Sequence, residues 1–399
     1  MKLSRLLMPL VLALALPLAH AAPITVVNGQ FVKDGKPFYG VGVNYFDGFT
    51  RYAGSSRDLT WKKGLATLNQ YKIPFIRINT FGFWTADFQK NYLNDKAAFY
   101  ARLDAFMNEA KAQNVGVVLD LFWNYTMFVD LNNEKMKAWG QQNSATRKMM
   151  RALTTEIVTR YKGHPALWGW EFSNEANSYM DLPEANNNHQ YLPPKQFNTK
   201  STRDASDNFD KSVIISALAD FAKTTRIIDP KTPIFSGHNA TRSTAYHLQN
   251  NKNWVQDSGT QFGEMVSRDN VAPVSGVKPD VDTLTMHIYP NYEGTFFNSK
   301  TGSKFGDILT QTMARSKLDK RPFFLGEFGV DEKILGKEAA KAKFVEMTDA
   351  IMANRVPMSA LWVFDFAYQE GTYNVTSTNS RSYQLDKLKQ MNITMSSWK

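Results

Sequence analysis

Leu167-Trp-Gly-Trp-Glu-Phe-Ser-Asn-Glu175 is a largely apolar run that ends in three polar residues. A parallel strand buried on both faces has this composition, because helices cover both sides of a parallel sheet. The run Pro322-Phe-Phe-Leu-Gly-Glu-Phe-Gly329 has the same form and carries Glu327 near its end. Each run therefore predicts a buried strand with a carboxylate at its carboxyl end. Glu175 and Glu327 are so far apart in sequence that only the fold can bring them together.

Apolar runs of this kind occur eight times and alternate with stretches of helical period. The runs are 40–45, 74–80, 115–122, 167–174, 233–237, 283–289, 322–327 and 360–366. The predicted helices are 58–71, 96–114, 145–162, 207–228, 305–318, 337–354 and 382–391, with a short helix near 262–268. Eight strand–helix repeats predict an α/β fold, a (β/α)8 TIM barrel. The alternative, an open doubly wound sheet, usually has fewer strands, and no Gly-rich phosphate loop follows the first strand.

Two further features accompany the predicted barrel. Residues 24–39 read as an N-terminal β-hairpin with its turn at Asp34-Gly35. Long loops follow several strand ends, on the C-terminal face, and the longest, 176–206, is rich in Asn and Pro. We expect residues 22–399 to form a single (β/α)8-barrel domain.

Residues 1–21 have the layout of a secretory signal peptide. A basic start is followed by the apolar stretch 6–18 and by small residues around Ala21. The apolar stretch is too short to span a bilayer, and no other run is long enough. The 399-residue chain contains no cysteine, so it has no disulfide. We expect a secreted protein, extracellular or periplasmic, with a retained N-terminal anchor as the alternative.

The formal net charge of +10 comes from scattered Lys and Arg residues. No nucleic-acid-binding motif accompanies the charge, so we expect no nucleic-acid partner. A soluble basic surface is the simplest interpretation, and weak attraction to anionic polysaccharide is the alternative. The chain has no zinc motif of the His-Glu-x-x-His type and no calcium loop. We therefore predict no metal and no cofactor, and expect a monomer.

In a barrel of this kind the active site forms at the carboxyl ends of the strands. The polar and aromatic residues at those ends are Asn44, Tyr45, Arg77, Asn79, Asp120, Trp123, Asn124, Asn174, Glu175, His238, Asn239, His287, Tyr289, Glu327, Trp362 and Asp365. If the barrel forms, these side chains converge on one pocket. Two carboxylates across a sugar linkage are the minimum machinery for glycoside hydrolysis.

The chain resembles glycoside hydrolase family five, the retaining cellulases and mannanases of the clan of barrel hydrolases. The matching residues are Arg77, Asn174-Glu175, His287-Ile-Tyr289, Glu327 and Trp362, together with the opening hairpin and Gly42-Val-Asn44. The resemblance covers roughly the whole mature chain and rests on the order and spacing of these residues. It departs at the third strand, where the family usually has a His and this chain reads Val118-Leu-Asp-Leu-Phe-Trp-Asn124. Family mannanases often carry Asn-Trp type sequences there, so the departure bears on the substrate.

The resemblance implies a role for each matching residue. Glu327 is expected to be the nucleophile, kept ionised by Arg77 and Tyr289, and Glu175 the general acid and then base. Asn174 is expected to donate to the sugar 2-hydroxyl, His287 to orient the acid, and Trp362 to form a platform under the sugar. Candidate walls for further sugars, each with core packing as the alternative, are Trp84, Trp123, Trp254, Tyr179 and Tyr292. Glu171 reads as structural, Trp168 and Trp170 as outer-face packing, and His238 as either structural or functional.

These expectations define a secreted retaining endo-β-glycosidase that acts on β-linked polysaccharide. The first substrate candidate is β-1,4-mannan, and β-1,4-glucan is next. A transglycosylase and a hydrolase of a bacterial exopolysaccharide are alternatives on the same scaffold. A non-catalytic polysaccharide-binding protein is a further alternative, and it would be expected to lack one of the two glutamates.

Overall fold

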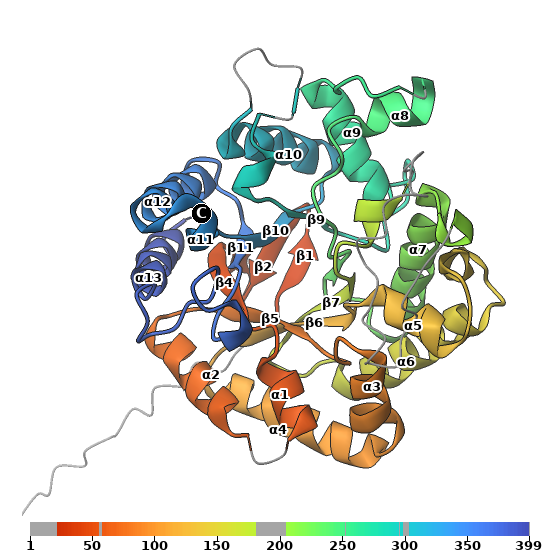
Figure 1. Ribbon diagram of the computed structural model, residues 1–399, viewed down its shortest axis with the longest axis horizontal. Helices are drawn as coiled ribbons and strands as arrows, with labels where there is room; N and C mark the ends of the chain where they lie inside the picture. Colours follow the sequence, from red (N-terminus) through yellow and green to blue (C-terminus); the bar gives the residue numbers. More distant parts are fainter. Residues whose placement is uncertain are drawn as a thin grey trace, which may run out of the picture.

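A computed structural model describes residues 22–55, 58–180, 205–251, 253–294, 296–297 and 303–398. The expected signal peptide and most of the loop 176–206 lie outside these residues. In the described chain, eight parallel strands form one sheet in the order β8-β7-β6-β5-β4-β11-β10-β9. They are β4 (Gly40–Asn44), β5 (Phe75–Asn79), β6 (Gly116–Phe122), β7 (Leu167–Ser173), β8 (Ile234–Phe235), β9 (Leu284–His287), β10 (Phe323–Phe328) and β11 (Met358–Leu361). Figure 1 shows helices around these central strands, and the predicted (β/α)8 barrel is confirmed.

Polar contacts join β8 and β9, the two end strands of the sheet. The backbone N–H of Ile234 donates to Asp282 Oδ1 at 3.1 Å, and the Thr283 hydroxyl donates to the Ile234 carbonyl at 2.7 Å. Further along, the N–H of Ala240 donates to the carbonyl of His287 at 3.1 Å. The short strand β8 is therefore held beside β9 without a regular ladder.

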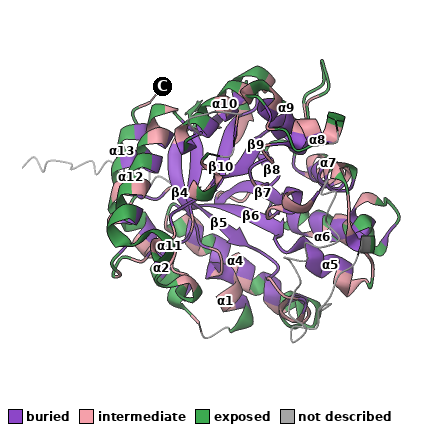
Figure 2. Cartoon of the chain, turned by 45° about the horizontal axis from the view of Figure 1, so that its top comes forward, coloured by how far each residue is buried: buried purple, intermediate pink, exposed green. Residues whose placement is uncertain are grey.

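All residues of the eight barrel strands are buried, which explains their continuous apolar sequences. In Figure 2 the strands are purple and the outer helices carry the exposed residues. A separate apolar cluster at the amino end of the barrel includes Phe75, Trp168 and Phe235. Gly116 makes room for this cluster, because a Cβ there would lie 2.1 Å from the Trp168 ring. Trp168 thus packs into this cluster, contrary to the outer-face prediction, whereas Trp170 belongs to the main core.

The N-terminal segment forms three strands, so the predicted single hairpin is wrong in detail. Strands β1 (Thr25–Val27), β2 (Gln30–Lys33) and β3 (Lys36–Pro37) make an antiparallel sheet. Asn28 and Gly29, with φ of 51° and 77°, form a turn before the expected one at Asp34-Gly35. Such paired positive φ values suit a two-residue hairpin turn, a signal that the sequence contained.

The helices follow the predicted order with shifted ends. The longer ones are α2 (Thr60–Gln70), α4 (Lys96–Ala112), α6 (Ala145–Tyr161), α7 (Lys211–Ile228), α9 (Gly259–Asp269), α10 (Phe305–Asp319), α12 (Lys337–Ala353) and α13 (Tyr383–Met395). Helix α7 begins later than predicted because Asp210 caps it, accepting from the N–H of Ser212. Short helices are α1 (Gly48–Gly54), α3 (Thr85–Phe88), α5 (Tyr125–Leu131), α8 (Ala245–Asn251) and α11 (Glu332–Leu335). None of the described helices is long and apolar enough to cross a membrane.

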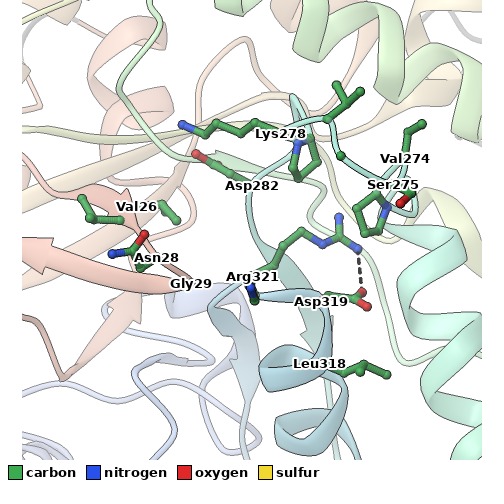
Figure 3. Close-up of a pocket in the computed structure, with 16 residues that line it drawn as sticks. Val26, Asn28, Gly29, Val274, Ser275, Lys278, Asp282, Leu318, Asp319 and Arg321 are labelled. Atoms are coloured by element: carbon green, nitrogen blue, oxygen red, sulfur yellow. Dashed lines mark hydrogen bonds and ion pairs between the residues drawn. The ribbon is translucent and has the colours of Figure 1, made fainter.

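A pocket lies near the amino ends of β9 and β10, away from the carboxyl ends where the predicted site residues gather. The turn at Asn28-Gly29 and the segment 273–279 form its walls. Figure 3 shows the buried guanidinium of Arg321 paired with Asp319 beside it. This pocket contains none of the predicted site residues.

Helix α13 is tied to the first barrel strand by one side chain. Asn392 accepts from the N–H of Val41 at 2.7 Å and donates to the Val41 carbonyl at 2.9 Å. The Asn392 amide also donates to the carbonyl of Lys72, just before β5, at 3.2 Å. Strands β4 and β5 pair directly only from Val43 onward. Asn392 therefore links the two chain segments before that point, where they do not pair with each other.

We predict that Asn392→Ala lowers the free energy of unfolding by about 1–3 kcal/mol, because it leaves the buried polar groups of Val41 unpaired. Urea denaturation followed by circular dichroism measures this change. Gln390→Ala is the control, since Gln390 is exposed on the same helix. Equal effects of the two substitutions would show that the bridge contributes nothing.

Candidate active site

The guanidinium of Arg77 is the centre of a buried network of side chains. It rises from β5 and is fully buried. Its partners come from four strands and their ends: Asn44 Oδ1 (3.0 Å), Asp120 Oδ2 (3.0 Å), Asn174 Oδ1 (2.9 Å), Glu327 Oε1 (2.8 Å) and Glu171 Oε2. The barrel thus brings these strand ends together around one cation, as expected for a site on its C-terminal face.

Glu327 is held on β10 by two hydrogen-bond donors. Arg77 Nη1 donates to one carboxylate oxygen, and the Tyr289 hydroxyl donates to the other at 2.6 Å. Burial raises the pKa of Glu327, and the guanidinium and hydroxyl act against that rise. The arrangement therefore favours an ionised carboxylate with a fixed orientation.

Glu175 follows β7 in a left-handed conformation, with φ of 52°. Its backbone N–H donates to the carbonyl of Gly237 at 2.7 Å, which fixes the turn. The side chain is 18% exposed, so it faces the opening of the barrel. Burial raises the pKa of Glu175 to about 7, although Arg77 acts in the opposite direction. This carboxyl can therefore hold a proton at neutral pH.

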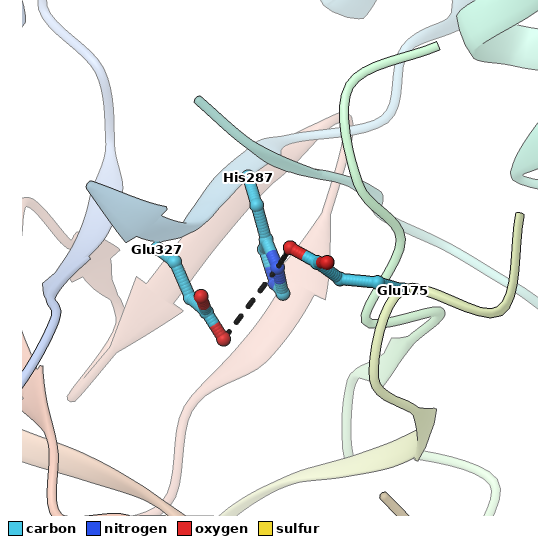
Figure 4. A group of neighbouring side chains, drawn as sticks. All are labelled: Glu175, His287 and Glu327. Atoms are coloured by element: carbon cyan, nitrogen blue, oxygen red, sulfur yellow. Dashed lines mark hydrogen bonds and ion pairs between the residues drawn. The ribbon is translucent and has the colours of Figure 1, made fainter. Parts of the chain in front are cut away.

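His287 lies between the two glutamates, as Figure 4 shows. Its Nδ1 is 3.0 Å from Glu175 Oε1 and 3.5 Å from Glu327 Oε1. Burial lowers the pKa of His287 to about 3, so the imidazole is neutral at working pH. A neutral ring can form a hydrogen bond with Glu175 without adding a positive charge between the two carboxyl groups.

One ligand-type atom from each of Glu175, His287 and Glu327 lies within 4.8 Å of the other two. Among the described residues this is the one group with a spacing that suits a metal ion. One hydrogen bond, between His287 Nδ1 and Glu175 Oε1, already accounts for the contact of these two residues. The absence of a metal from the reaction stays a prediction.

Aromatic rings form one wall beside the carboxylates. Trp362 follows β11, which ends earlier than predicted, and its indole N–H donates to Gln369 Oε1 at 2.8 Å. The Trp123 ring lies 6.0 Å from the Trp362 ring and 4.1 Å from the Arg77 guanidinium. Phe46 joins them, with ring centroids 4.9 Å from Trp123 and 5.8 Å from Trp362. The sequence prediction missed Phe46, although it follows the strand-end residues Asn44 and Tyr45.

The outer aromatic candidates divide into two groups. Trp84 continues the wall through Phe83, whose ring lies 4.6 Å from that of Trp84 and 6.1 Å from that of Phe46. Trp254 is 51% exposed and lies near the Arg242 guanidinium, and no ring contact among the described residues joins it to the wall.

Three further candidates follow neighbouring strands. Tyr179 comes after β7, His238 after β8 and Tyr292 after β9. Tyr292 donates to Asn239 Oδ1 at 2.8 Å, and Tyr179 is half-buried in the turn after Glu175. His238 is fully buried, and its ring nitrogens have no hydrogen-bond partner within the described chain.

These contacts define a glycoside hydrolase of the retaining class. Carboxylates that act as nucleophile and acid/base lie roughly 5–5.5 Å apart, whereas inverting enzymes need a wider gap for water. Here oxygens of Glu175 and Glu327 approach within 4.8 Å. Residues 32–367 match the family model of cellulase (glycosyl hydrolase family 5), and the chain belongs to this family.

Solved structures of similar fold include two mannanases and a cellulase. The endo-1,4-beta-mannanase from Rhizomucor miehei is 15% identical, with a TM-score of 0.66, over 94% of this chain and 100% of that chain. The endo-beta-1,4-mannanase from Thermotoga petrophila is 12% identical, with a TM-score of 0.60, over 91% and 78%. A hyperthermostable endocellulase is 15% identical, with a TM-score of 0.59, over 94% and 99%. No curated protein matches the chain.

The raised pKa of Glu175 predicts how activity depends on pH. The acid must be protonated to assist departure of the leaving group, so kcat/KM for an unactivated glycoside should fall about tenfold per pH unit above pH 7. The pH profile of the wild-type enzyme measures this limb. With an activated aryl glycoside, whose departure needs little protonation, the limb should weaken. An equally steep limb with both substrates would assign it to another group.

Proposed function

We propose that this protein is a secreted endo-acting hydrolase of β-1,4-mannan that works by double displacement. The close approach of Glu175 and Glu327, with different surroundings, carries the proposal. Glu327 is in contact with a guanidinium and a phenol, whereas Glu175 contacts a neutral imidazole. Two carboxyls whose environments favour different protonation states supply a nucleophile and an acid.

In the first step Glu327 attacks the anomeric carbon while Glu175 donates its proton to the departing glycosidic oxygen. The bond to the leaving sugar breaks, and an ester forms between the glycone and Glu327. In the second step Glu175, now ionised, accepts a proton from water, which attacks the anomeric carbon and releases Glu327. Together the two steps restore the starting protonation state of the pair.

Asn174 is oriented to assist this reaction. Its Oδ1 accepts from Arg77 Nη2 at 2.9 Å, so its amide N–H groups are left to donate. Asn174 is half-buried beside Glu175, and a donor there can reach the 2-hydroxyl of the sugar. Such a contact strengthens as positive charge develops on the ring.

Three observations support mannan as the substrate. Trp123-Asn124 takes the place of the third-strand His that is usual in the family. The Trp123 ring of the aromatic wall packs against the Arg77 guanidinium and so reaches the site itself. Two of the solved structures of similar fold are named as endo-mannanases. Glucan is the second candidate, because another is named as an endocellulase.

The aromatic wall supports cleavage inside a polymer. From Trp362 it continues over the ends of β4 and β11 through Phe46 and Phe366, 5.0 Å apart, to Tyr368, which is 89% exposed. The acid Glu175 follows β7, which lies across the barrel from β11, so we place this part of the wall on the side of the glycone. Rings that extend this far can stack on several consecutive sugars.

We predict that the secreted enzyme hydrolyses mannan and glucomannan faster than carboxymethyl cellulose, xyloglucan or mixed-linkage glucan. Release of reducing ends measures the rates, and viscosity should fall faster than reducing ends appear if cleavage is internal. Faster hydrolysis of a glucan would move the assignment to cellulase.

Transfer products at high acceptor concentration would favour the transglycosylase. Turnover of a bacterial exopolysaccharide alone would favour a hydrolase of that polymer. Binding without turnover of any glycan would favour a binding protein.

The two glutamates should respond differently to removal. Glu327→Ala should abolish turnover, and azide should partly restore it by attacking from the vacated side to give an α-glycosyl azide. Glu175→Ala should slow poor leaving groups far more than activated aryl glycosides. Product stereochemistry by NMR and rates on both substrate types measure these effects. Near-normal activity of Glu327→Ala would show that another residue is the nucleophile.

A further inference from the structure

Three carboxylates surround the single guanidinium of Arg77. Asp120, Glu171 and Glu327 each place an oxygen against it, and their side chains are 0%, 0% and 5% exposed. If all three were ionised, two negative charges would remain unbalanced in a water-poor space. Such charges are costly to bury, and a carboxylate in this position takes up a proton instead.

The surroundings of the three acids differ. Each acid accepts one N–H of Arg77: Nε donates to Glu171, Nη1 to Glu327 and Nη2 to Asp120. Glu327 has the Tyr289 hydroxyl as a second donor. Burial, followed by the proximity of Glu171, raises the pKa of Asp120 well above its usual range.

The strand register places Asp120 and Glu171 side by side. They are paired residues on the parallel strands β6 and β7. Asp120 Oδ1 and Glu171 Oε1 are both buried and have no hydrogen-bond partner among the residues described. A proton on Asp120 removes the repulsion between these neighbours and turns one of the two unpaired acceptors into a donor.

We propose that Asp120 carries a proton in the working enzyme, and that Glu171 is the ionised carboxylate that shares Arg77 with the nucleophile Glu327. Glu171 is then a positioning residue, because it acts on Glu327 through Arg77 and does not touch the sugar. The negative charge of Glu171 offsets part of the positive charge of Arg77. The pKa of Glu327 is therefore higher than it would be if Arg77 had no second ionised partner. This inference rests on the proposed hydrolase function and names a residue that sets its pH range.

The other titratable groups around Arg77 and Glu327 change little in the acid range. They are His287, Tyr289, Tyr373 and Glu175. His287 is neutral there because burial lowers its pKa to about 3. Burial raises the pKa of both tyrosines, so their hydroxyls keep their protons. Glu175 stays protonated below about pH 7. The acid limb of kcat/KM therefore reports ionisation of Glu327 under the influence of Glu171 and Asp120.

Two isosteric substitutions separate the roles of the neighbouring acids. Glu171→Gln removes a negative charge but keeps an oxygen that can accept from Arg77 Nε. It should lower the pKa of Glu327 and move the acid limb to lower pH by on the order of one unit. Asp120→Asn imitates a protonated acid, so it should leave the position of that limb where it is, whatever its effect on kcat. A purely structural role for Glu171 would reduce kcat without moving the limb.

The measurement is kcat/KM against pH for wild type and both variants, with an activated aryl β-glycoside and with folding checked by thermal denaturation. Equal downward shifts in the two variants would show that Asp120 is ionised. No shift in Glu171→Gln would show that its charge does not reach Glu327. Either result overturns the proposal.

An infrared measurement tests the proton without turnover. In a Glu175→Gln background, which removes the catalytic acid that also holds a proton near neutral pH, Asp120→Asn should abolish a carboxylic C=O band at that pH. Persistence of that band would overturn the assignment. If the wild-type enzyme hydrolyses no β-glycoside, the proposed function fails, whereas the infrared result still decides whether Asp120 holds a proton. The same measurement serves if Glu171→Gln does not fold.

Discussion

The ion pair between Arg77 and Glu327 is the interaction on which the rest of the site depends. It joins β5 to β10 across the barrel, and the same guanidinium reaches the neighbouring strand ends through Asp120 and Asn174. Breaking a buried pair by removal of one partner costs about 3–5 kcal/mol, because it leaves an uncompensated charge. This network determines which side chains face one another at the carboxyl end of the barrel.

The same network separates the two catalytic carboxyls by their surroundings. Glu327 lies deep, with two donors directed at it, and these donors stabilise its ionised form. Glu175 lies nearer the opening, beside a neutral histidine, and burial favours its protonated form. Neither carboxyl has an unusual sequence neighbourhood by itself. Their difference arises only when β5, β7, β9 and β10 are assembled.

The sequence predicted the barrel well, because strands buried on both faces are continuous apolar runs and their helices are long and periodic. It did not predict features that depend on short elements or on three-dimensional neighbours. The turn at Asn28-Gly29 was missed beside the stronger expected turn at Asp34-Gly35, and helix α8 (Ala245–Asn251) is too short to show a helical period. Phe46 looked like any apolar residue after a strand, and its place beside Trp362 follows from the closure of β4 against β11. Likewise, Glu171 read as structural because sequence alone does not show that it shares a guanidinium with Glu327.

The reaction and the substrate are encoded in different parts of the molecule. The carboxylates and their donors sit on strands or within two residues of a strand end, where the barrel fixes their positions. The rings that would contact further sugars, such as Trp84, Phe366 and Tyr368, lie farther along the loops. Loops accept changes in length and composition more readily than strands do, so a scaffold can keep its chemistry while its sugar preference changes. This division explains why the geometry around Arg77 supports the class of reaction more strongly than the identity of the glycan. The third strand is the exception, because Trp123 contacts both the guanidinium and the aromatic wall. A substitution of Trp123 that changed the sugar preference would therefore also change the electrostatic surroundings of Glu327.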